Sequence, residues 1–142
     1  MSADDPVEGI VQPECPATIL IVEDHAGTGA ALAALLGGAF AGSRLQVAQS
    51  AERALQICDA SCPSVVVMDV GLPGMDGFEA TRRIKIRWPQ TVVVMHSLHT
   101  EAVYRDHALA AGASAFVSKG RAASELAPTI KRLLISAGAR AG

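Results

Sequence analysis

Short apolar runs recur along the chain, and segments with helix-like spacing separate them. The run Thr18–Val22 has no polar alternation, which is typical of a strand that is covered on both faces. Ser64–Met68 and Thr91–Met95 have the same character, and Leu45–Ala48 and Ala115–Val117 are shorter and weaker examples. The pattern therefore predicts five strands.

The intervening segments place apolar residues on one side of a helix. The predicted faces consist of Leu32, Leu35, Leu36 and Phe40; Ala51, Ala54, Leu55 and Cys58; Gly77, Ala80, Ile84 and Trp88; and Leu126, Ile130, Leu133 and Leu134. Ser50 is the predicted N-cap of the second helix, and Pro89 is expected to end the third. The fourth segment, Thr100–Ala111, has the weakest apolar face, so we expect the least firmly packed helix there. Pro128 lies near the start of the last helix, where it is tolerated only in the first turn.

Five strands that alternate with five helices predict an α/β fold. Right-handed crossovers then give a five-stranded parallel sheet between two helical layers, a (βα)5 three-layer sandwich. We expect residues 18–135 to form this domain. Residues 1–17 are acidic and contain three prolines, and residues 136–142 are mostly Gly and Ala, so these ends are predicted to be a flexible leader and a flexible tail.

Composition narrows the class of protein. With 142 residues, 50% of them hydrophobic, and a net charge of −2, the chain can fill a core and is not intrinsically disordered. Lys+Arg 12 against Asp+Glu 14 gives no basic excess for binding nucleic acid directly. No apolar run approaches the roughly 20 residues that cross a membrane, and the acidic start does not resemble a signal peptide. The three cysteines form no CxxC pair, so we expect reduced thiols and a cytoplasmic location.

Polar residues stand where the predicted strands end. Glu23 and Asp24 follow the first strand, Asp69 the third, Ser97 the fourth and Lys119 the fifth. The carboxyl ends of parallel strands meet at one edge of a sheet, where such folds bind their ligands. Each acid alone is more often a turn residue or helix cap. Together, three carboxylates repel one another unless a cation lies between them, and oxygen ligands of this kind suit Mg²⁺. A lysine and a serine beside them suit phosphoryl oxygens.

The motifs at these strand ends resemble a known family. The segments are Ile-Leu-Ile-Val-Glu23-Asp24-His25, Asp69-Val-Gly-Leu-Pro73-Gly74-Met75-Asp-Gly77, Ser97, and Gly112-Ala-Ser-Ala-Phe116-Val-Ser-Lys119. They look like the receiver domain of two-component response regulators over Thr18 to Leu134, and in particular like receivers fused to helix-turn-helix effectors. The resemblance implies a flavodoxin-like fold.

The resemblance also implies a role for each matched residue. It makes Asp69 the phosphoacceptor, Lys119 the partner of the phosphoryl group, Ser97 the switch hydroxyl and Phe116 the switch aromatic. It assigns Mg²⁺ to Glu23, Asp24, Asp69 and the backbone carbonyl of Gly71. His96 precedes Ser97, but its spacing from Asp69 and Lys119 fits the switch position less well. This chain departs from the common pattern at Glu23, where Asp is more usual, at Gly120, where many members have proline, and at Gly71, which lacks a side chain.

The leading hypothesis is a phosphorylation-switched signalling receiver, which is not an enzyme beyond catalysing its own phosphorylation and dephosphorylation. Its expected partners are a histidine kinase or histidine phosphotransfer protein, and a downstream protein target or a second copy of itself, with no direct contact with nucleic acid or membrane.

One alternative is the receiver half of a DNA-binding transcriptional regulator, although the Gly/Ala-rich tail favours a stand-alone regulator. Another is a phosphohydrolase with an Asp nucleophile, but Gly71 stands where that chemistry needs an acid.

Overall fold

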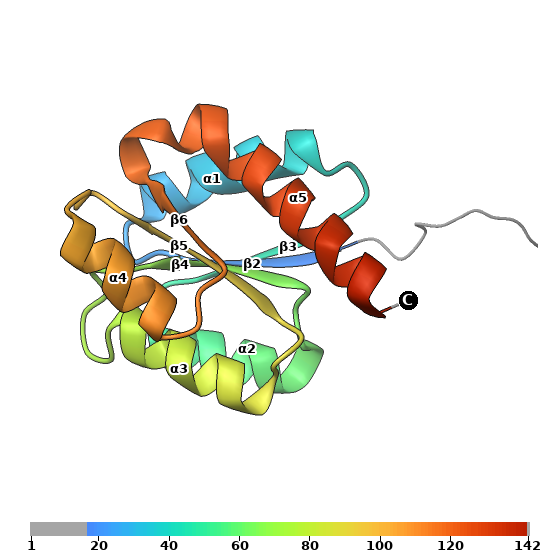
Figure 1. Ribbon diagram of the computed structural model, residues 1–142. Coiled ribbons are helices and arrows are strands. Elements are labelled where there is room, and N and C mark those ends of the chain that lie inside the picture. The colour runs from blue at the N-terminus through green and yellow to red at the C-terminus, as the bar shows by residue number, and fades with distance from the viewer. Residues whose placement is uncertain (1–16, 142) are drawn as a thin grey trace, which may run out of the picture.

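A five-stranded parallel sheet forms the centre of the molecule (Figure 1). The computed structural model describes residues 17–141, so residues 1–16 of the predicted leader lie outside the described part. The strands are β2 (Thr18–Val22), β3 (Arg44–Ala48), β4 (Val65–Asp69), β5 (Val92–Ser97) and β6 (Ala115–Ser118). Their order across the sheet is β3-β2-β4-β5-β6. The five predicted strands and the α/β fold class are confirmed.

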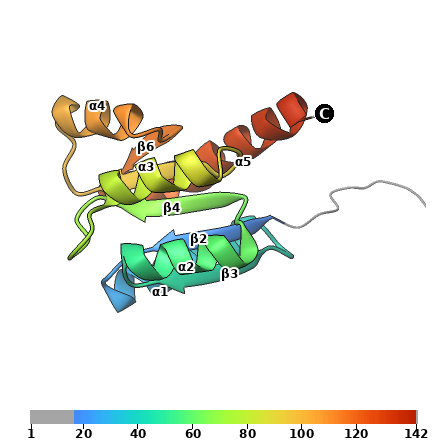
Figure 2. The same cartoon turned by 90° about the horizontal axis from the view of Figure 1, so that it is seen from below.

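Helices cover both faces of this sheet. They are α1 (Ala26–Ala39), α2 (Ala51–Ser61), α3 (Gly77–Arg87), α4 (Ala102–Ala110) and α5 (Ala122–Ala141), and a short 3-10 turn, η1 (Lys119–Arg121), precedes α5. Helices α1 and α5 lie on one face, α2 and α3 on the other, and α4 lies beside the edge strand β6 (Figures 1 and 2). The predicted cap of α2 is present, since the Ser50 hydroxyl accepts a hydrogen bond from the Arg53 N–H at 3.0 Å.

The hydrophobic core divides into two layers because successive strand residues point to opposite faces. Ile19 and Ile21 pack with the residues of α1 and α5, whereas Leu20 and Val22 pack with those of α2 and α3. All four side chains are fully buried. Burial on both faces explains the continuous apolar runs of β2, β4 and β5, whereas the edge strand β3 is largely exposed and has a mixed sequence. The parallel pairing places the carboxyl ends of the strands at one edge of the sheet.

The prediction for Pro128 was wrong. Helix α5 begins at Ala122, well before the apolar stripe, so Pro128 lies inside the helix and not in its first turn. Pro128 lacks the N–H that the carbonyl of Ser124 would accept, but both residues are exposed and that carbonyl can be hydrated. The helix also runs on to Ala141, past the predicted domain boundary at residue 135.

Helix α4 has the weak apolar face that the sequence predicted. Within α4 the buried side chain is that of Ala108, while Val103 and Leu109 are half exposed. The exposed His107 makes an edge-on contact with Phe78 of α3, with ring centroids 5.6 Å apart. Few side chains therefore pack this helix against the core, chiefly the buried Ala108 and the partly buried Tyr104.

Two adjacent glycines near the end of α1 provide a matched test of helix packing. A Cβ added at exposed Gly38 meets nothing within 4 Å, whereas one added at Gly37 comes within 3.2 Å of Leu45 Cδ1. Gly38→Ala is expected to raise the free energy of unfolding by about 0.5–1 kcal/mol, because alanine loses less backbone entropy in a helix. Gly37→Ala is expected to gain less, since Leu45 must shift. Chemical denaturation measures both variants, and a larger gain for Gly37→Ala would contradict this packing.

Candidate functional site

The carboxyl edge of the sheet holds the polar residues in fixed positions. Glu23 follows β2, and its N–H donates to the carbonyl of Ala48 at 2.9 Å. Asp69 is the last residue of β4 and is paired in register with His96 of β5. Gly77 begins α3 directly against β4, and a Cβ added there would overlap the carbonyl oxygen of Asp69. The position of Asp69 is thus fixed by the pairing with β5 and by the close approach of the first residue of α3.

Three carboxylates converge at this edge, as the sequence predicted. Ligand atoms of Glu23, Asp24, His25 and Asp69 all lie within 4.8 Å of one another. Glu23 is fully buried, Asp69 is nearly so, and Asp24 is partly exposed. Among the described residues no hydrogen-bond partner reaches the buried Oδ1 of Asp24. A cluster of hard oxygen atoms with one unsatisfied member fits a divalent cation.

Lys119 reaches into the cluster from the end of β6. Its Nζ lies 2.9 Å from Glu23 Oε1 and 3.3 Å from Asp69 Oδ1, so one ammonium group bridges two carboxylates. Burial opposes the charged form of Glu23, but hydrogen bonds from Lys119 and His25 outweigh it and lower the pKa of Glu23. Burial and the neighbouring charge of Glu23 raise the pKa of Asp69. Glu23 is therefore the tighter partner of Lys119.

His25, which directly follows the acid pair, also belongs to this site. Its Nδ1 lies 3.0 Å from Glu23 Oε2 and 3.4 Å from Asp24 Oδ1. Its backbone N–H donates to the same Glu23 oxygen at 3.1 Å. The hydrogen bond with Glu23, aided by the charge of Asp24, raises the pKa of His25. Its position directly after the acid pair was the only sequence signal for this contact.

His96 is a second histidine whose surroundings the sequence did not reveal. The side chain is buried, neither ring nitrogen has a hydrogen-bond partner within residues 17–141, and Nε2 lies 3.9 Å from Glu23 Oε1. Burial, together with the charge of Lys119, lowers the pKa of His96 to about 4. The imidazole beside Glu23 is therefore neutral at physiological pH.

A small pocket of about 110 Å³ opens above Asp69. It is lined by His25, Asp69, Gly71, Ser97, Leu98, His99 and Lys119. The N–H of Gly71 donates to Asp69 Oδ1 at 3.2 Å, and the Ser97 hydroxyl accepts a hydrogen bond from the N–H of His99 at 2.9 Å. Ser97 thus stands beside Asp69 and Lys119, as the strand ends predicted, and Gly71 lines the same pocket.

Phe116 does not line this pocket. It lies on β6 and is packed into the core layer shared with α2 and α3, with 8% of its surface exposed. The guanidinium group of Arg105, from α4, stacks over its ring at 5.2 Å from the centroid. The ring therefore connects the sheet edge with α4 and does not contact the acid cluster.

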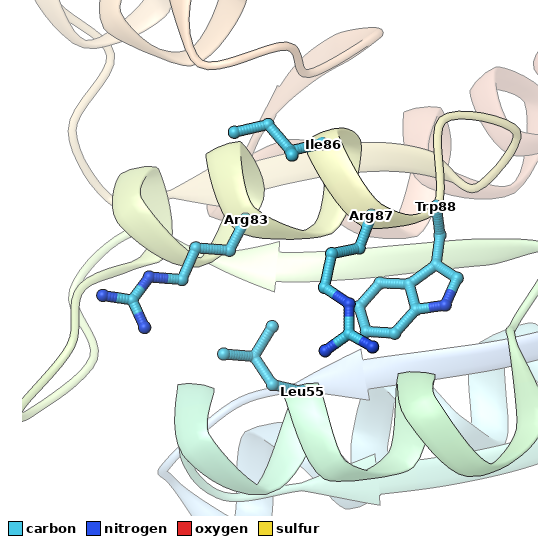
Figure 3. Close-up of a pocket in the computed structure, with 5 residues that line it drawn as sticks. All are labelled: Leu55, Arg83, Ile86, Arg87 and Trp88. Atoms are coloured by element: carbon cyan, nitrogen blue, oxygen red, sulfur yellow. The ribbon is translucent and has the colours of Figure 1, made fainter.

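A larger hollow of about 260 Å³ lies between α2 and α3, and its lining includes no carboxylate (Figure 3). Leu55, Arg83, Ile86, Arg87 and Trp88 line it. The Arg87 guanidinium lies 4.7 Å from the Trp88 ring centroid and 3.1 Å from Asp59 of α2, so its charge is already paired. The ionisable cluster at the strand ends is the better candidate for chemistry.

Comparison with known proteins identifies the family. The family model described as the response regulator receiver domain matches residues 19–131. The chain belongs to this receiver family. Receivers are modules of two-component signalling, and the sequence-based identification and the flavodoxin-like fold are confirmed.

Three relatives show the extent of the similarity. The transcriptional activator protein ExaE of Pseudomonas putida is 40% identical over 116 residues, which cover 82% of this chain and 54% of ExaE. A LuxR-family response regulator from Aurantimonas sp. SI85-9A1 superimposes with a TM-score of 0.80 at 29% identity, covering 84% of this chain and 86% of that structure. The BeF3-activated receiver domain of DrrB, a Thermotoga maritima protein, gives a TM-score of 0.75 at 28% identity, covering 83% and 97%.

The receiver spans about half the length of the curated relatives it matches. None of the helices within residues 17–141 has the length and apolar character needed to cross a membrane.

Proposed function

We propose that this receiver accepts a phosphoryl group on Asp69 from a histidine kinase or a histidine phosphotransfer protein. The position of Asp69 carries the proposal. Its carboxylate lies at the wall of a small open pocket, 3.3 Å from the ammonium group of Lys119 and inside an acidic cluster. Membership of the receiver family supports the same role.

The proposed transfer is a nucleophilic displacement at phosphorus. An ionised oxygen of Asp69 forms the new O–P bond, the P–N bond of the donor phosphohistidine breaks, and its electron pair returns to the donor imidazole. A carboxylate needs no general base for this attack. The receiver contributes by positioning Asp69, so it acts on itself and does not turn over a substrate.

The acidic cluster is the proposed site of Mg²⁺. Asp24, Asp69 and the carbonyl of Gly71 would hold the ion, and Glu23 completes the negative charge around it. The unsatisfied Oδ1 of Asp24 supports this assignment. When bound, Mg²⁺ supplies positive charge that offsets the charge of the incoming phosphoryl group.

Two residues beside Asp69 are the proposed binders of the phosphoryl oxygens. Lys119 is already in contact with Asp69, so a small adjustment brings its Nζ to the phosphoryl group. Ser97 now accepts a hydrogen bond from the N–H of His99, and its hydroxyl must move toward Asp69 to donate its own hydrogen to the new oxygen. We assign the transmission of that movement to Phe116, which packs between the sheet edge and Arg105 of α4.

The proposed output is transcriptional control in the cytoplasm, reached through a downstream protein or a second copy of the receiver. The name of ExaE, a transcriptional activator, supports this output, and so does the span of the receiver over about half of that relative. The chemistry of a phosphohydrolase is less favoured, because Gly71 offers no acid to protonate a leaving group.

Asp69→Asn is expected to abolish phosphorylation. After incubation with acetyl phosphate and Mg²⁺, intact mass spectrometry of the wild-type protein should show the addition of one phosphoryl group, which removal of Mg²⁺ prevents. Asn has no ionised oxygen, so Asp69→Asn should gain none. Asp76→Asn is the matched control, because Asp76 is an exposed cap of α3 and Asn caps helices equally well.

Equal labelling of Asp69→Asn and the wild type would overturn the assignment of the phosphoacceptor. Continuous release of phosphate from a monoester substrate would favour the phosphohydrolase instead.

A further inference from the structure

His25 occupies the N-cap position of α1 but does not cap the helix. Its backbone is extended, with φ −90° and ψ 114°, and its side chain makes no capping hydrogen bond. The imidazole turns instead toward the acid cluster, and its Nδ1 is the only nitrogen among the four ligand atoms that lie within 4.8 Å of one another in the described chain. The side chain is 71% exposed, so the approach from solvent is open.

The neighbouring carboxylates differ in how many hydrogen bonds their oxygens already accept. Both oxygens of Glu23 have partners, since Oε1 accepts from Lys119 and Oε2 accepts from the backbone N–H of His25. Asp24 Oδ1 has no hydrogen-bond partner within the described residues. Asp69 Oδ1 accepts from the N–H of Gly71, and His25 Nδ1 is held 3.0 Å from Glu23 Oε2, so an incoming ion meets a free oxygen on Asp24 and takes the place of Glu23 beside the imidazole.

A second, independent observation concerns His96, which lies on the buried side of this cluster. The imidazole of His96 is 1% exposed, neither of its nitrogens has a hydrogen-bond partner in residues 17–141, and Nε2 approaches Glu23 Oε1 at 3.9 Å. A buried polar ring without partners directed at Glu23 is costly unless the cluster holds a group that compensates for it.

We propose that His25 is a metal ligand, so that this site binds borderline divalent ions such as Co²⁺ and Ni²⁺ more tightly than an all-oxygen site would. The inference rests on the proposed function, because it concerns the same acidic cluster. Carboxylate and carbonyl oxygens suit Mg²⁺, whereas an imidazole nitrogen adds affinity for transition ions and contributes little for Mg²⁺. On coordination, Nδ1 releases to solvent the proton that it otherwise shares with Glu23.

Calorimetric titration of the full chain with Co²⁺ and, separately, with Mg²⁺ tests the assignment. His25→Ala is expected to weaken Co²⁺ binding about tenfold and to leave Mg²⁺ binding equal to or tighter than that of the wild type. His99→Ala is the matched control, because His99 lines the same pocket but lies outside the ligand cluster, and it should retain wild-type affinity for both ions. In ¹⁵N-labelled protein, Zn²⁺ should shift the resonance of His25 Nδ1, and Mg²⁺ should not.

The outcomes separate this inference from the proposed function. If His25→Ala binds Co²⁺ as tightly as the wild type, or if Zn²⁺ leaves Nδ1 unshifted, His25 is not a ligand, while Mg²⁺ binding and phosphorylation of Asp69 are unaffected. If Mg²⁺ fails to bind the wild type and acetyl phosphate fails to label it, the proposed function itself is wrong. Asp24→Asn checks that both ions occupy the acid cluster, since it should weaken both.

Discussion

Gly77→Ala is expected to destabilise the protein by about 3 kcal/mol, at the upper end of the usual cost of overpacking. A Cβ at this position overlaps the carbonyl oxygen of Asp69 and comes within 3.0 Å of Met95 Cε. Backbone cannot move aside as a flexible side chain can, so α3 and the end of β4 must separate. The same separation displaces Asp69 from Lys119, so labelling by acetyl phosphate should also become slower.

Gly71→Ala is the matched control for that variant. Gly71 lies in the loop that leads from β4 to Gly77, and a Cβ added there meets nothing within 4 Å. Its free energy of unfolding is expected to stay within about 0.5 kcal/mol of the wild type, as for most exposed positions. Urea denaturation compares the two variants. Equal stability of Gly77→Ala and Gly71→Ala would show that α3 and β4 are not in the close contact described.

Acidification is expected to destabilise the wild-type protein through His96. In the unfolded chain His96 has the ordinary histidine pKa near 6.5, and in the folded protein burial lowers its pKa to about 4. As the pH falls below 6.5 the unfolded state takes up a proton that the folded state refuses, so stability is lost between these values and the loss levels off below about pH 4. Between about pH 7.5 and pH 5 this one group should cost about 2 kcal/mol.

His96→Leu isolates that contribution. Leucine fills a buried site of similar size without a titratable group, so the variant should lose about 2 kcal/mol less than the wild type over the same pH interval. His107→Gln, at an exposed position, should retain the wild-type profile. Denaturation at several pH values provides the comparison, and parallel profiles for the wild type and His96→Leu would rule out a buried neutral imidazole.

Much of the fold was predictable because a strand that is buried on both faces is apolar at successive positions. Val65–Asp69 and Val92–Ser97 are buried along their whole length, and each begins with four consecutive apolar residues. Once the strands were located, the parallel arrangement placed Asp69 and Lys119 at one edge without any knowledge of side-chain positions. Pro128 was misplaced because the helix extends beyond its apolar stripe, and a pattern of buried residues does not report exposed turns.

The details of the site depended on side-chain geometry that no sequence pattern encodes. That Lys119 contacts Glu23 more closely than Asp69 follows from the reach of the longer acid. The inward turn of His25 follows from its extended backbone at the start of α1. The burial of His96 follows from its place between Asp69 and Val117 on neighbouring strands. These three contacts determine the electrostatics of the site.

The strand order β3-β2-β4-β5-β6 has a consequence for synthesis on the ribosome. Each new strand pairs with one that has already been made, β3 and β4 with β2, β5 with β4, and β6 with β5. The sheet can therefore grow as the chain emerges, because each strand after the first finds a partner already in place. The carboxylates are in place when β4 joins, but their counter-charge, Lys119, arrives only with the final edge strand. A nascent chain thus carries an unneutralised acidic cluster until its last strand is added.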